Sequence, residues 1–341
     1  MPAPATTDEF LELVRKSGLV EDTALTAFLK TAGPLPQVPA EAAAQLYLAG
    51  LITPWQGGQL LRGVYKPFRL AGYRLLDKFG EVEIGSVFQS VNLARIPISL
   101  IVWPDVLANK LDLLEGVYRS AGPGVLYHQN AVRLLDIYSE ESVLFLVMEM
   151  IEGTQLSRVL LNAGGHLPVG EACGCAIQVA AGLQAAHEAG LVHRHIRPSN
   201  VFVNETGLVK IFGLGLHRAF DAALKESQDE SLWDYSAPEQ ALDGPVDCWT
   251  DIYSLGATLY HLIAGHAPRR FAPTHTHFTI PPILAVRSDV PETLSPIVAK
   301  MIEKRPENRY QSMAEVIAAL RPFVEPAPVG NFPPMAEAAL G

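Results

Sequence analysis

The N-terminal part of the chain contains short amphipathic stretches separated by breaker residues. Within each stretch, apolar residues recur at the spacing of one helix face. The predicted helices begin at Asp8, Glu21, Pro39 and Thr53-Pro54. Because each stretch is short and its apolar stripe is narrow, these helices must pack on one another or on a neighbour. We therefore predict a small all-α unit over residues 1–66, which docks on the next part of the chain or recruits a partner.

A different pattern follows, in which short β-type runs are separated by turn residues. The predicted strands are Tyr73–Leu76, Ser86–Phe88, Ile98–Val102, Ala131–Ile137 and Val143–Met148. One helical pattern, from Val106 to Arg119, interrupts them. From Gln155 onward the pattern is mostly helical, until a Pro/Ala-rich end follows Phe323.

Strands first and helices after predict an α+β protein with two lobes behind the all-α unit. The expected boundaries are 67–150 for a small β-rich lobe, 151–324 for a large α-helical lobe and 325–341 for a Pro/Ala-rich tail. We see no internal repeat that would favour a solenoid.

Composition narrows the classes of function. Of 341 residues, 49% are hydrophobic and 18% charged, which argues against extended disorder. A net charge of −10 disfavours a nucleic-acid partner. The most apolar run, Ile252–Ala264, is interrupted by polar residues and predicts a buried helix rather than a membrane span. With no signal-peptide pattern at the start, we expect a protein of the cytoplasm with no membrane partner.

Cysteine and histidine usage does not predict a metal site. Three cysteines are too few for a disulfide framework in a chain of this length. Cys173 and Cys175 lie in an apolar helical run and point to different sides of it, so we interpret them as small buried hydrophobes. Thr274–His277, with His266 nearby, is better explained as a polar loop than as a ligand set. We therefore predict no bound metal.

Five motifs occur in one order and at mutually consistent spacing. They are Leu146–Gly153, His193–Asn200, Tyr235–Glu239, Asp251–Gly256 and Arg305–Tyr310. Through these motifs the stretch from Tyr73 to about Arg321 resembles the serine/threonine protein kinase family. The helical extension is similar to those that precede kinase domains in some bacterial proteins. The resemblance implies a two-lobed protein-kinase-like fold.

The resemblance also implies structural roles for five residues. They are His193, Arg194, Glu239, Asp251 and Arg309. In the family, the positions of Glu239 and Arg309 form an ion pair that holds the large lobe together with Asp251. Buried charges persist only when they are paired. His193 and Leu214 are further implied to stack as residues of the family's regulatory core.

Nucleotide binding in the family uses a glycine-rich loop, the backbone of a hinge and an asparagine. The corresponding residues are Gly80, Gly85, Glu149, Ile151 and Asn200. In that loop, backbone amides approach phosphates closely, which glycine allows. Here the middle glycine is replaced by Val82, while Glu81 and Glu83 add negative charge. The loop is therefore a poor phosphate cradle.

The positions that carry catalysis in the family have changed their chemistry. The degenerate positions are Ile101, His195, Arg197 and Gly213. Ile101 stands where a lysine binds the phosphates, His195 where an aspartate faces the substrate hydroxyl, and Gly213 where an aspartate holds the metal. The partner glutamate of that lysine is also unclear, since Arg119 falls nearest its position and Glu115 lies one turn earlier.

We therefore predict a catalytically inactive kinase-like protein, or pseudokinase, which acts in signalling by contact with an active kinase or its substrate. One alternative is an ATP-dependent enzyme of altered mechanism that transfers a phosphoryl or nucleotidyl group through His195, Arg197 and Asn200. Another alternative retains ATP at the hinge backbone without magnesium and without catalysis. The sequence leaves the oligomeric state open.

The segment from Leu214 to Tyr235 corresponds to the activation segment of the family. Its acidic stretch contains Ser227 and Ser231, which another kinase could phosphorylate, with Arg194 as the receiving cation. An unmodified, solvated loop explains the same composition more simply.

Overall fold

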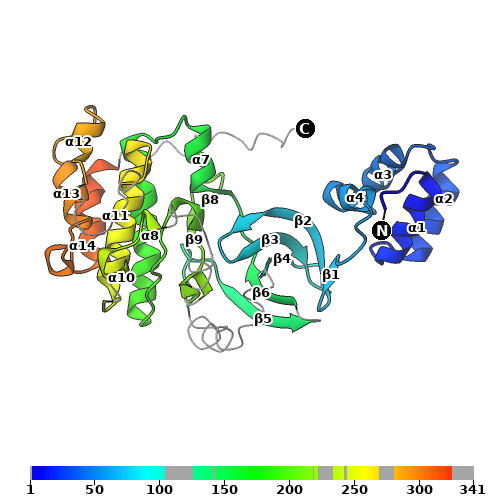
Figure 1. Ribbon diagram of the computed structural model, residues 1–341, viewed down its shortest axis with the longest axis horizontal. Coiled ribbons are helices and arrows are strands. Elements are labelled where there is room, and N and C mark those ends of the chain that lie inside the picture. The colour runs from blue at the N-terminus through cyan, green and yellow to red at the C-terminus, as the bar shows by residue number, and fades with distance from the viewer. Residues whose placement is uncertain are drawn as a thin grey trace. The chain divides into compact units, whose positions relative to one another are not determined.

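The structure of the protein is a computed structural model (Figure 1). It describes residues 2–103, 126–140, 143–217, 219–221, 233–241, 244–268 and 280–324. Contacts divide the chain into two compact units. The first comprises Met1–Glu81, Gly85–Ala108 and Ile137–Met150, and the second comprises Val82–Ile84, Asn109–Asp136 and Ile151–Gly341.

The first unit begins with the predicted helices. They are α1 (Thr7–Ser17), α2 (Asp22–Ala32), α3 (Pro39–Leu48) and α4 (Pro54–Leu61). Thr6 caps α1 by accepting a hydrogen bond from Glu9 N, and Thr53 and Gln56 form a reciprocal capping box on α4. The helices share a core in which Phe10, Val14 and Leu46 are fully buried. The apolar stripes of the sequence therefore face one another.

These helices dock on the sheet of the first unit through polar contacts as well as packing. The Gln56 side chain, fully buried, donates from Nε2 to the Leu75 carbonyl oxygen at 2.5 Å. Arg74 donates from Nη2 to the Leu51 carbonyl oxygen at 3.1 Å. The Trp55 ring lies edge-on to Phe88, with ring centroids 5.5 Å apart. The helices are therefore joined to the strands within one compact unit.

Within the described ranges, the sheet has six strands in the order β1-β2-β3-β4-β6-β5. The strands are β1 (Arg69–Leu70), β2 (Tyr73–Val82), β3 (Gly85–Val91), β4 (Pro97–Val102), β5 (Leu134–Glu140) and β6 (Val143–Glu149). Strand β4 is central, and its Ile101 lies opposite Val87 on β3 and Leu146 on β6. β-Branched and aromatic residues fill these strands, as their preference for a half-buried pleated surface predicts.

Two sequence predictions about the strands need correction. The predicted strand Ala131–Ile137 begins only at Leu134, because Ala131 and Val132 pair instead with Ile211 of the second unit's own sheet. The predicted strand Tyr73–Leu76 continues to Val82, so Gly80 lies inside β2 rather than in a loop. The resemblance had placed Gly80 in the glycine-rich loop, but extended backbone also accepts a glycine.

The second unit contains a small sheet and a helical core. Its elements are β7 (Thr154–Gln155), α7 (Leu156–Asn162), α8 (Val169–Glu188), η1 (Pro198–Asn200), β8 (Val201–Val203), β9 (Val209–Ile211), α10 (Pro238–Ala241), α11 (Cys248–Ala264), α12 (Ile283–Val286), α13 (Ser295–Met301), η3 (Pro306–Asn308), α14 (Met313–Leu320) and η4 (Arg321–Phe323). Helices α8 and α11 run side by side, and α11 is buried along almost its whole length (Figure 1). The apolar run Ile252–Ala264 is therefore a core helix.

Cys173 and Cys175 are buried on α8 within this core. Burial raises the pKa of both thiols to about 12, so neither is a thiolate near neutral pH.

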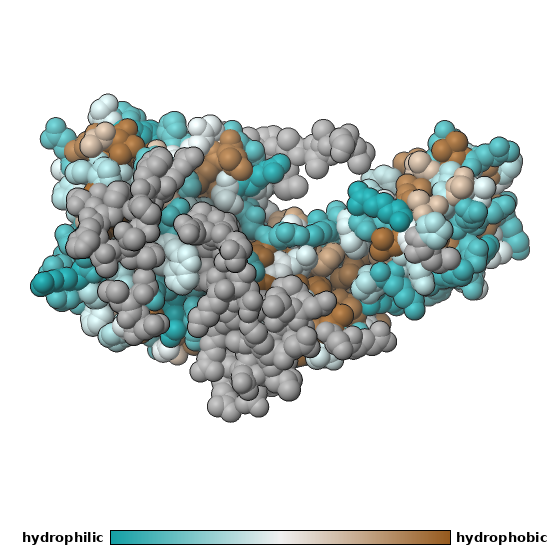
Figure 2. Space-filling model, in the orientation of Figure 1, coloured by the Kyte–Doolittle hydropathy of each residue, from teal (hydrophilic) through white to brown (hydrophobic). Residues whose placement is uncertain are grey.

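In the described part of the chain, no helix has both the length and the apolar character that crossing a bilayer requires. Figure 2 shows brown atoms interspersed with teal over the N-terminal helices, where Val38, Tyr47 and Leu48 are exposed.

Several segments named from the sequence lie outside the described residues. They are the predicted helix Val106–Arg119 with Glu115, the serines Ser227 and Ser231, the loop Thr274–His277 and the tail 325–341. His266 is described, and its Nδ1 lies 3.1 Å from the carbonyl oxygen of Ala267.

Candidate functional site

The loop His193–Asn200 is held from below by one buried carboxylate. Asp251, from the first turn of α11, accepts hydrogen bonds from the backbone amides of His193 at 2.9 Å and Arg194 at 2.7 Å. His187 donates to the same carboxylate from Nε2 at 2.8 Å. Burial alone would raise the pKa of Asp251, but these donors and the nearby histidines lower it below its ordinary value. The lowered pKa favours the charged form of the carboxylate that fixes the loop.

The same carboxylate stabilises an unusual backbone conformation at Arg194, whose φ is 71°. Non-glycine residues adopt this left-handed region only when surrounding contacts compensate for its cost. Next to it, the buried His193 ring lies 2.8 Å through Nε2 from the Phe212 carbonyl oxygen and accepts from His195 N at Nδ1. This pattern requires a neutral ring protonated on Nε2, and burial lowers the pKa of His193 accordingly.

His195, at the family's catalytic aspartate position, is hydrogen-bonded to Asp221 of the same unit. Its Nε2 lies 2.9 Å from Oδ1 of Asp221, and Nη1 of Arg194 lies 3.8 Å from the other carboxylate oxygen. Burial on its own raises the pKa of Asp221, but the hydrogen bond and charge of His195, with the charge of Arg194, hold it below its ordinary value. His195 therefore donates to an aspartate instead of presenting a carboxylate to a substrate.

Gly213, at the family's metal-binding aspartate position, has no room for a side chain. It adopts φ +101°, and a Cβ atom built there would lie 2.4 Å from Cε2 of Phe220. Phe220 is buried in a helical turn after Leu216, where its backbone amide donates to the Leu216 carbonyl oxygen at 3.1 Å. Its ring also packs against His195, with centroids 5.2 Å apart. An aromatic ring therefore lies against the point where a metal-binding side chain would begin.

Asn200 keeps one atom suited to a metal. Its Nδ2 donates to the His195 carbonyl oxygen at 3.0 Å, while its buried Oδ1 has no hydrogen-bond partner among the described residues. Magnesium prefers several oxygen ligands in octahedral geometry. Over the described ranges, no group of three or more His, Cys, Asp or Glu side chains is arranged to hold a metal ion. The described residues therefore do not fit a family-type magnesium site.

Arg197, which replaces the catalytic-loop lysine, is also engaged. Its Nη2 lies 2.8 Å from Oε1 of Glu83, which also accepts from Ser199 Oγ at 2.8 Å. Arg197 Nε in turn donates to Ser199 Oγ at 2.8 Å. Val82–Ile84, which run from the last residue of β2 to the start of β3, belong to the second unit by their contacts. The loop that cradles phosphates in the family here supplies a carboxylate to the catalytic loop.

The remaining positions that correspond to nucleotide-binding residues of the family have roles in the packing or the strands of this fold. Ile101 is fully buried between Val87 and Leu146 on β4, so an apolar wall replaces the lysine. Gly85 adopts φ +151°, and a Cβ there would lie 2.1 Å from the Val102 carbonyl oxygen. Close packing on β4 therefore requires that glycine. At the expected hinge, Glu149 ends β6 and Ile151 is buried.

Glu239 and Arg309 lie together as a bidentate ion pair. Nη1 and Nη2 of Arg309 each donate to one carboxylate oxygen of Glu239 at 2.8 Å. Thr250 donates to Glu239 at 2.9 Å, and the Arg309 guanidinium also bonds backbone carbonyls, including that of Trp249 at 2.8 Å. Burial raises the pKa of Glu239, but the arginine outweighs it and the net pKa is lowered. The pair ties α10 to the segment before α14.

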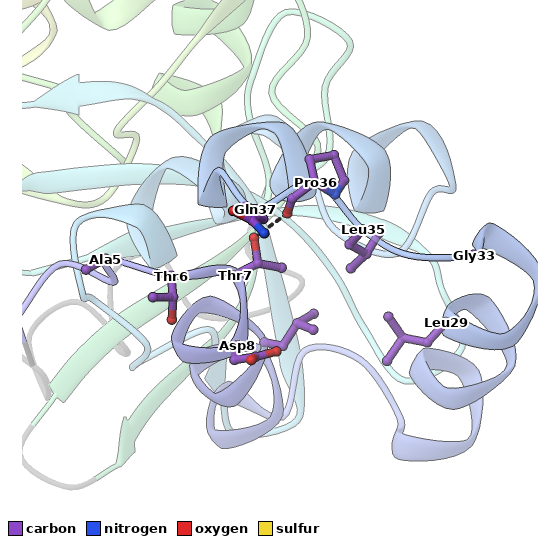
Figure 3. A pocket seen from close by; sticks show the side chains of 10 residues that line it. Ala5, Thr6, Thr7, Asp8, Leu29, Gly33, Leu35, Pro36 and Gln37 are labelled. Carbon is purple, nitrogen blue, oxygen red and sulfur yellow. Dashed lines mark hydrogen bonds between the residues drawn. The ribbon is translucent and has the colours of Figure 1, made fainter.

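A separate pocket lies in the helical part of the first unit (Figure 3). It encloses about 650 Å³ between the start of α1, the end of α2 and the connection to α3. Its lining includes the apolar side chains Leu11, Leu29 and Leu35, with Thr7 and Asp8 at the polar side. Thr7 Oγ1 donates across it to the Pro36 carbonyl oxygen at 2.5 Å. None of its lining residues belongs to the kinase-like motifs.

Sequence reasoning missed four members of the site. Phe220, Asp221 and Ser199 were not singled out, and Glu83 was noted for its charge without its partner. Ser199 lies within the recognised loop His193–Asn200, two residues after Arg197, so its position in the motif could have indicated a role in the site. The contact of Glu83 with Ser199 spans 116 positions, and no short-range pattern predicts it.

Comparisons with known proteins agree on one family. The family profile described as the protein kinase domain matches residues 124–319, beginning after β4. A probable serine/threonine-protein kinase of Clostridium perfringens is 32% identical over 259 residues, which is 73% of this chain and 38% of that protein. Serine/threonine-protein kinase PknL of Mycobacterium tuberculosis is 35% identical over 196 residues, 55% of this chain and 49% of that protein. Serine/threonine-protein kinase PknA of the same species is 34% identical over 287 residues, 78% of this chain and 65% of that protein. The chain thus spans less than two thirds of the length of each of these relatives.

Proposed function

This chain belongs to the protein kinase domain family, and we propose that it is a pseudokinase, a family member that regulates by contact and does not transfer phosphate from ATP. The observation that carries the proposal is the ring of Phe220 against Gly213, which excludes a side chain at the metal-binding position. Phosphoryl transfer depends on metal ions that neutralise the charge of the transferred group. Without that ligand, the described site does not supply them.

Two further observations support the proposal. His195 is bonded to Asp221, and Arg197 is bonded to Glu83, so both changed catalytic-loop positions already have partners within the protein. Meanwhile the structural positions keep their family contacts, with Asp251 under the loop and Glu239 on Arg309. Loss of chemistry together with retention of these contacts favours a role for the fold itself. We propose that its partner is a protein, either an active kinase or its substrate, and that it acts in the cytoplasm.

The printed names of the relatives favour a second candidate, an ATP-dependent serine/threonine protein kinase. Its specific support in this chain is the pair of His195 and Asp221, because an imidazole held by a carboxylate can serve as a general base. Asn200 Oδ1 would then be the retained metal contact. This candidate requires an additional metal ligand that the described residues do not supply.

A thermal-shift titration of the full chain with ATP, with and without magnesium, separates these proposals. A ligand that binds the folded form and not the unfolded chain raises the melting temperature, by more as its free concentration rises above its Kd. The pseudokinase proposal predicts no shift, or a shift of equal size with magnesium and with a chelator, as expected for ATP held by backbone alone. A shift that appears only with magnesium and disappears in Asn200→Ala would overturn it in favour of the enzyme.

A further inference from the structure

The connection between β2 and β3 begins with a largely buried carboxylate, that of Glu83. Glu83 lies between Val82 and Ile84, which are both buried, and its own side chain is only 10% exposed. Neighbouring Glu81, by contrast, is 71% exposed and pairs with Lys78 at 2.6 Å. Glu81 near the end of β2 and Glu83 just after it therefore have different environments. Glu83 is built into the second unit, while Glu81 faces solvent.

Glu83 closes a three-membered polar network. Its Oε1 lies 2.8 Å from Arg197 Nη2 and 2.8 Å from Ser199 Oγ, and Arg197 Nε lies 2.8 Å from the same hydroxyl. The Ser199 hydroxyl accepts from Arg197 and donates to Glu83, so each proton has one acceptor. A guanidinium with an adjacent hydroxyl donor is the set of groups that recognises a carboxylate or phosphate oxygen.

The network is incomplete on the carboxylate side. Glu83 Oε2 is buried and, in the part of the chain that the structure describes, has no hydrogen-bond partner. A buried charged oxygen without a donor is costly, and such atoms in native structures call for an explanation. Glu83 bonds Arg197 and Ser199 through Oε1 alone and leaves Oε2 without a donor, so it satisfies this pair of donors imperfectly. Release of Glu83 would therefore lose less than a fully satisfied ion pair would lose.

We propose that Arg197 and Ser199 form a phosphoryl-binding site that Glu83 occupies from within the chain. The ligand class is a metal-free phosphoryl or polyphosphate group, which would displace the Glu83 carboxylate and take over both donors. Glu83 then acts as an internal competitor that keeps nucleotide phosphates out. The interpretation that Glu83 keeps ATP out of an inactive site rests on the proposed function. The competition between Glu83 and a phosphoryl group for Arg197 and Ser199 does not depend on it.

The test is calorimetric titration of the full chain with tripolyphosphate in the presence of a metal chelator. Glu83→Ala removes the competitor, and Glu81→Gln is the matched control two residues earlier, near the end of β2. If Glu83 occupies the site at least nine tenths of the time, its removal strengthens tripolyphosphate binding about ten-fold or more. Glu81→Gln should bind as the wild type does. Adding Arg197→Met to Glu83→Ala should abolish the gain.

Two results would overturn the proposal. One is equal tripolyphosphate affinity in wild type and Glu83→Ala, and the other is a gain that persists in the Arg197→Met double variant. If Glu83→Ala does not fold by circular dichroism, Glu83→Gln carries the same comparison, since it removes the charge and keeps the side-chain size. A parallel titration with ATP identifies the source of the phosphoryl group. Tighter binding of ATP than of tripolyphosphate assigns a nucleotide, and equal binding assigns the phosphoryl groups alone.

These outcomes are independent of the proposed function. Magnesium-dependent transfer from ATP by the wild type would overturn the pseudokinase proposal and leave the Glu83 comparison intact. Conversely, unchanged tripolyphosphate binding in Glu83→Ala would refute the role of Glu83 as an internal competitor. It would not affect the pseudokinase proposal, which rests on the missing metal ligand at Gly213.

Discussion

The ring of Phe220 lies directly against the backbone of Gly213, so that a Cβ atom at position 213 would be 2.4 Å from Phe220 Cε2. The absence of a side chain at position 213 is therefore a packing requirement of this fold. Restoring an aspartate there would require both a strained backbone, since φ is +101°, and movement of a buried aromatic ring. Catalytic residues cannot be returned one at a time to such a site.

We predict that Gly213→Ala lowers the free energy of unfolding by about 2–5 kcal/mol. The estimate combines about 1–2 kcal/mol for a left-handed non-glycine residue with about 1–3 kcal/mol for overpacking. Urea denaturation measures it. The matched control is Gly174→Ala on α8, where a Cβ would make an ordinary 3.9 Å contact with Val324. There the change should be neutral or stabilising by up to about 1 kcal/mol. Equal stabilities of Gly213→Ala and wild type would show that Phe220 is not seated as described.

His195→Ala should raise the pKa of the Asp221 carboxyl group. Burial already raises that pKa, and the variant removes the hydrogen bond and charge of His195 that oppose it. NMR of the side-chain carboxyl carbon of isotope-labelled aspartate, followed as a function of pH, measures the shift in this pKa. His187→Ala is the control, because His187 bonds Asp251 and should leave Asp221 unchanged. A pKa for Asp221 that does not move in His195→Ala would contradict the pairing.

The same pair should shape stability in acid. Because the folded pKa of Asp221 lies below its unfolded value of about 3.9, its contribution is present above about pH 4 and is lost as pH falls through the folded pKa. His195→Ala should therefore flatten the dependence of the unfolding free energy on pH below about 4. Denaturant unfolding across that range, with His187→Ala alongside, measures the slope. An unchanged slope in His195→Ala would argue against a depressed Asp221 pKa.

Particular residues show what the sequence could predict and what it could not. Glu239 and Arg309 belong to local motifs whose family roles predict their pairing, and the structure brings the two together. Asp251 was expected to be structural, but its contacts with the backbone of the catalytic loop were not predicted. His195 and Gly213 could be identified as changed from one position in a motif. Their new neighbours could not, because Asp221 and Phe220 reach them through a helical turn in a segment with no motif of its own.

The glycine-rich connection shows the same limit. Val82 and Glu83 identified it as a poor phosphate cradle, but the strand β2 that continues through Gly80 depends on pairing with β-sheet neighbours. The burial of Glu83 depends on Arg197 and Ser199, which are far from it in sequence. Long-range ion pairs of this kind follow from the tertiary structure, and local propensity does not encode them.

Arg309→Met should destabilise the protein by about 3–5 kcal/mol, because it leaves the buried Glu239 carboxylate without its bidentate partner. Chemical denaturation measures the loss. Replacing both members, with Glu239→Leu added, should cost less than the sum of the single changes, since no charge is then stranded. The exposed pair of Lys16 and Glu12 provides the contrast, and Lys16→Met should change stability by at most about 1 kcal/mol. Strict additivity of the two core changes would refute the coupling.

Gln56→Leu should loosen the contact between α4 and the sheet. The variant removes the donor to the Leu75 carbonyl oxygen and the acceptor for Thr53 N, at a cost of about 1–3 kcal/mol. Gln59→Leu on the same helix is the matched control, because it makes the same change at a side chain that is only partly buried. Hydrogen exchange of β2 amides should increase in the first variant only. Equal exchange in both would show that Gln56 does not join the helices to the strands.

The central claim is that this kinase-like site does not activate the terminal phosphate of ATP. The most direct measurement incubates the full chain with γ-labelled ATP and magnesium or manganese, and follows both label on protein and released phosphate. We predict that the wild type matches the protein-free background and the His195→Ala variant. A rate of transfer above background that His195→Ala abolishes would contradict the account.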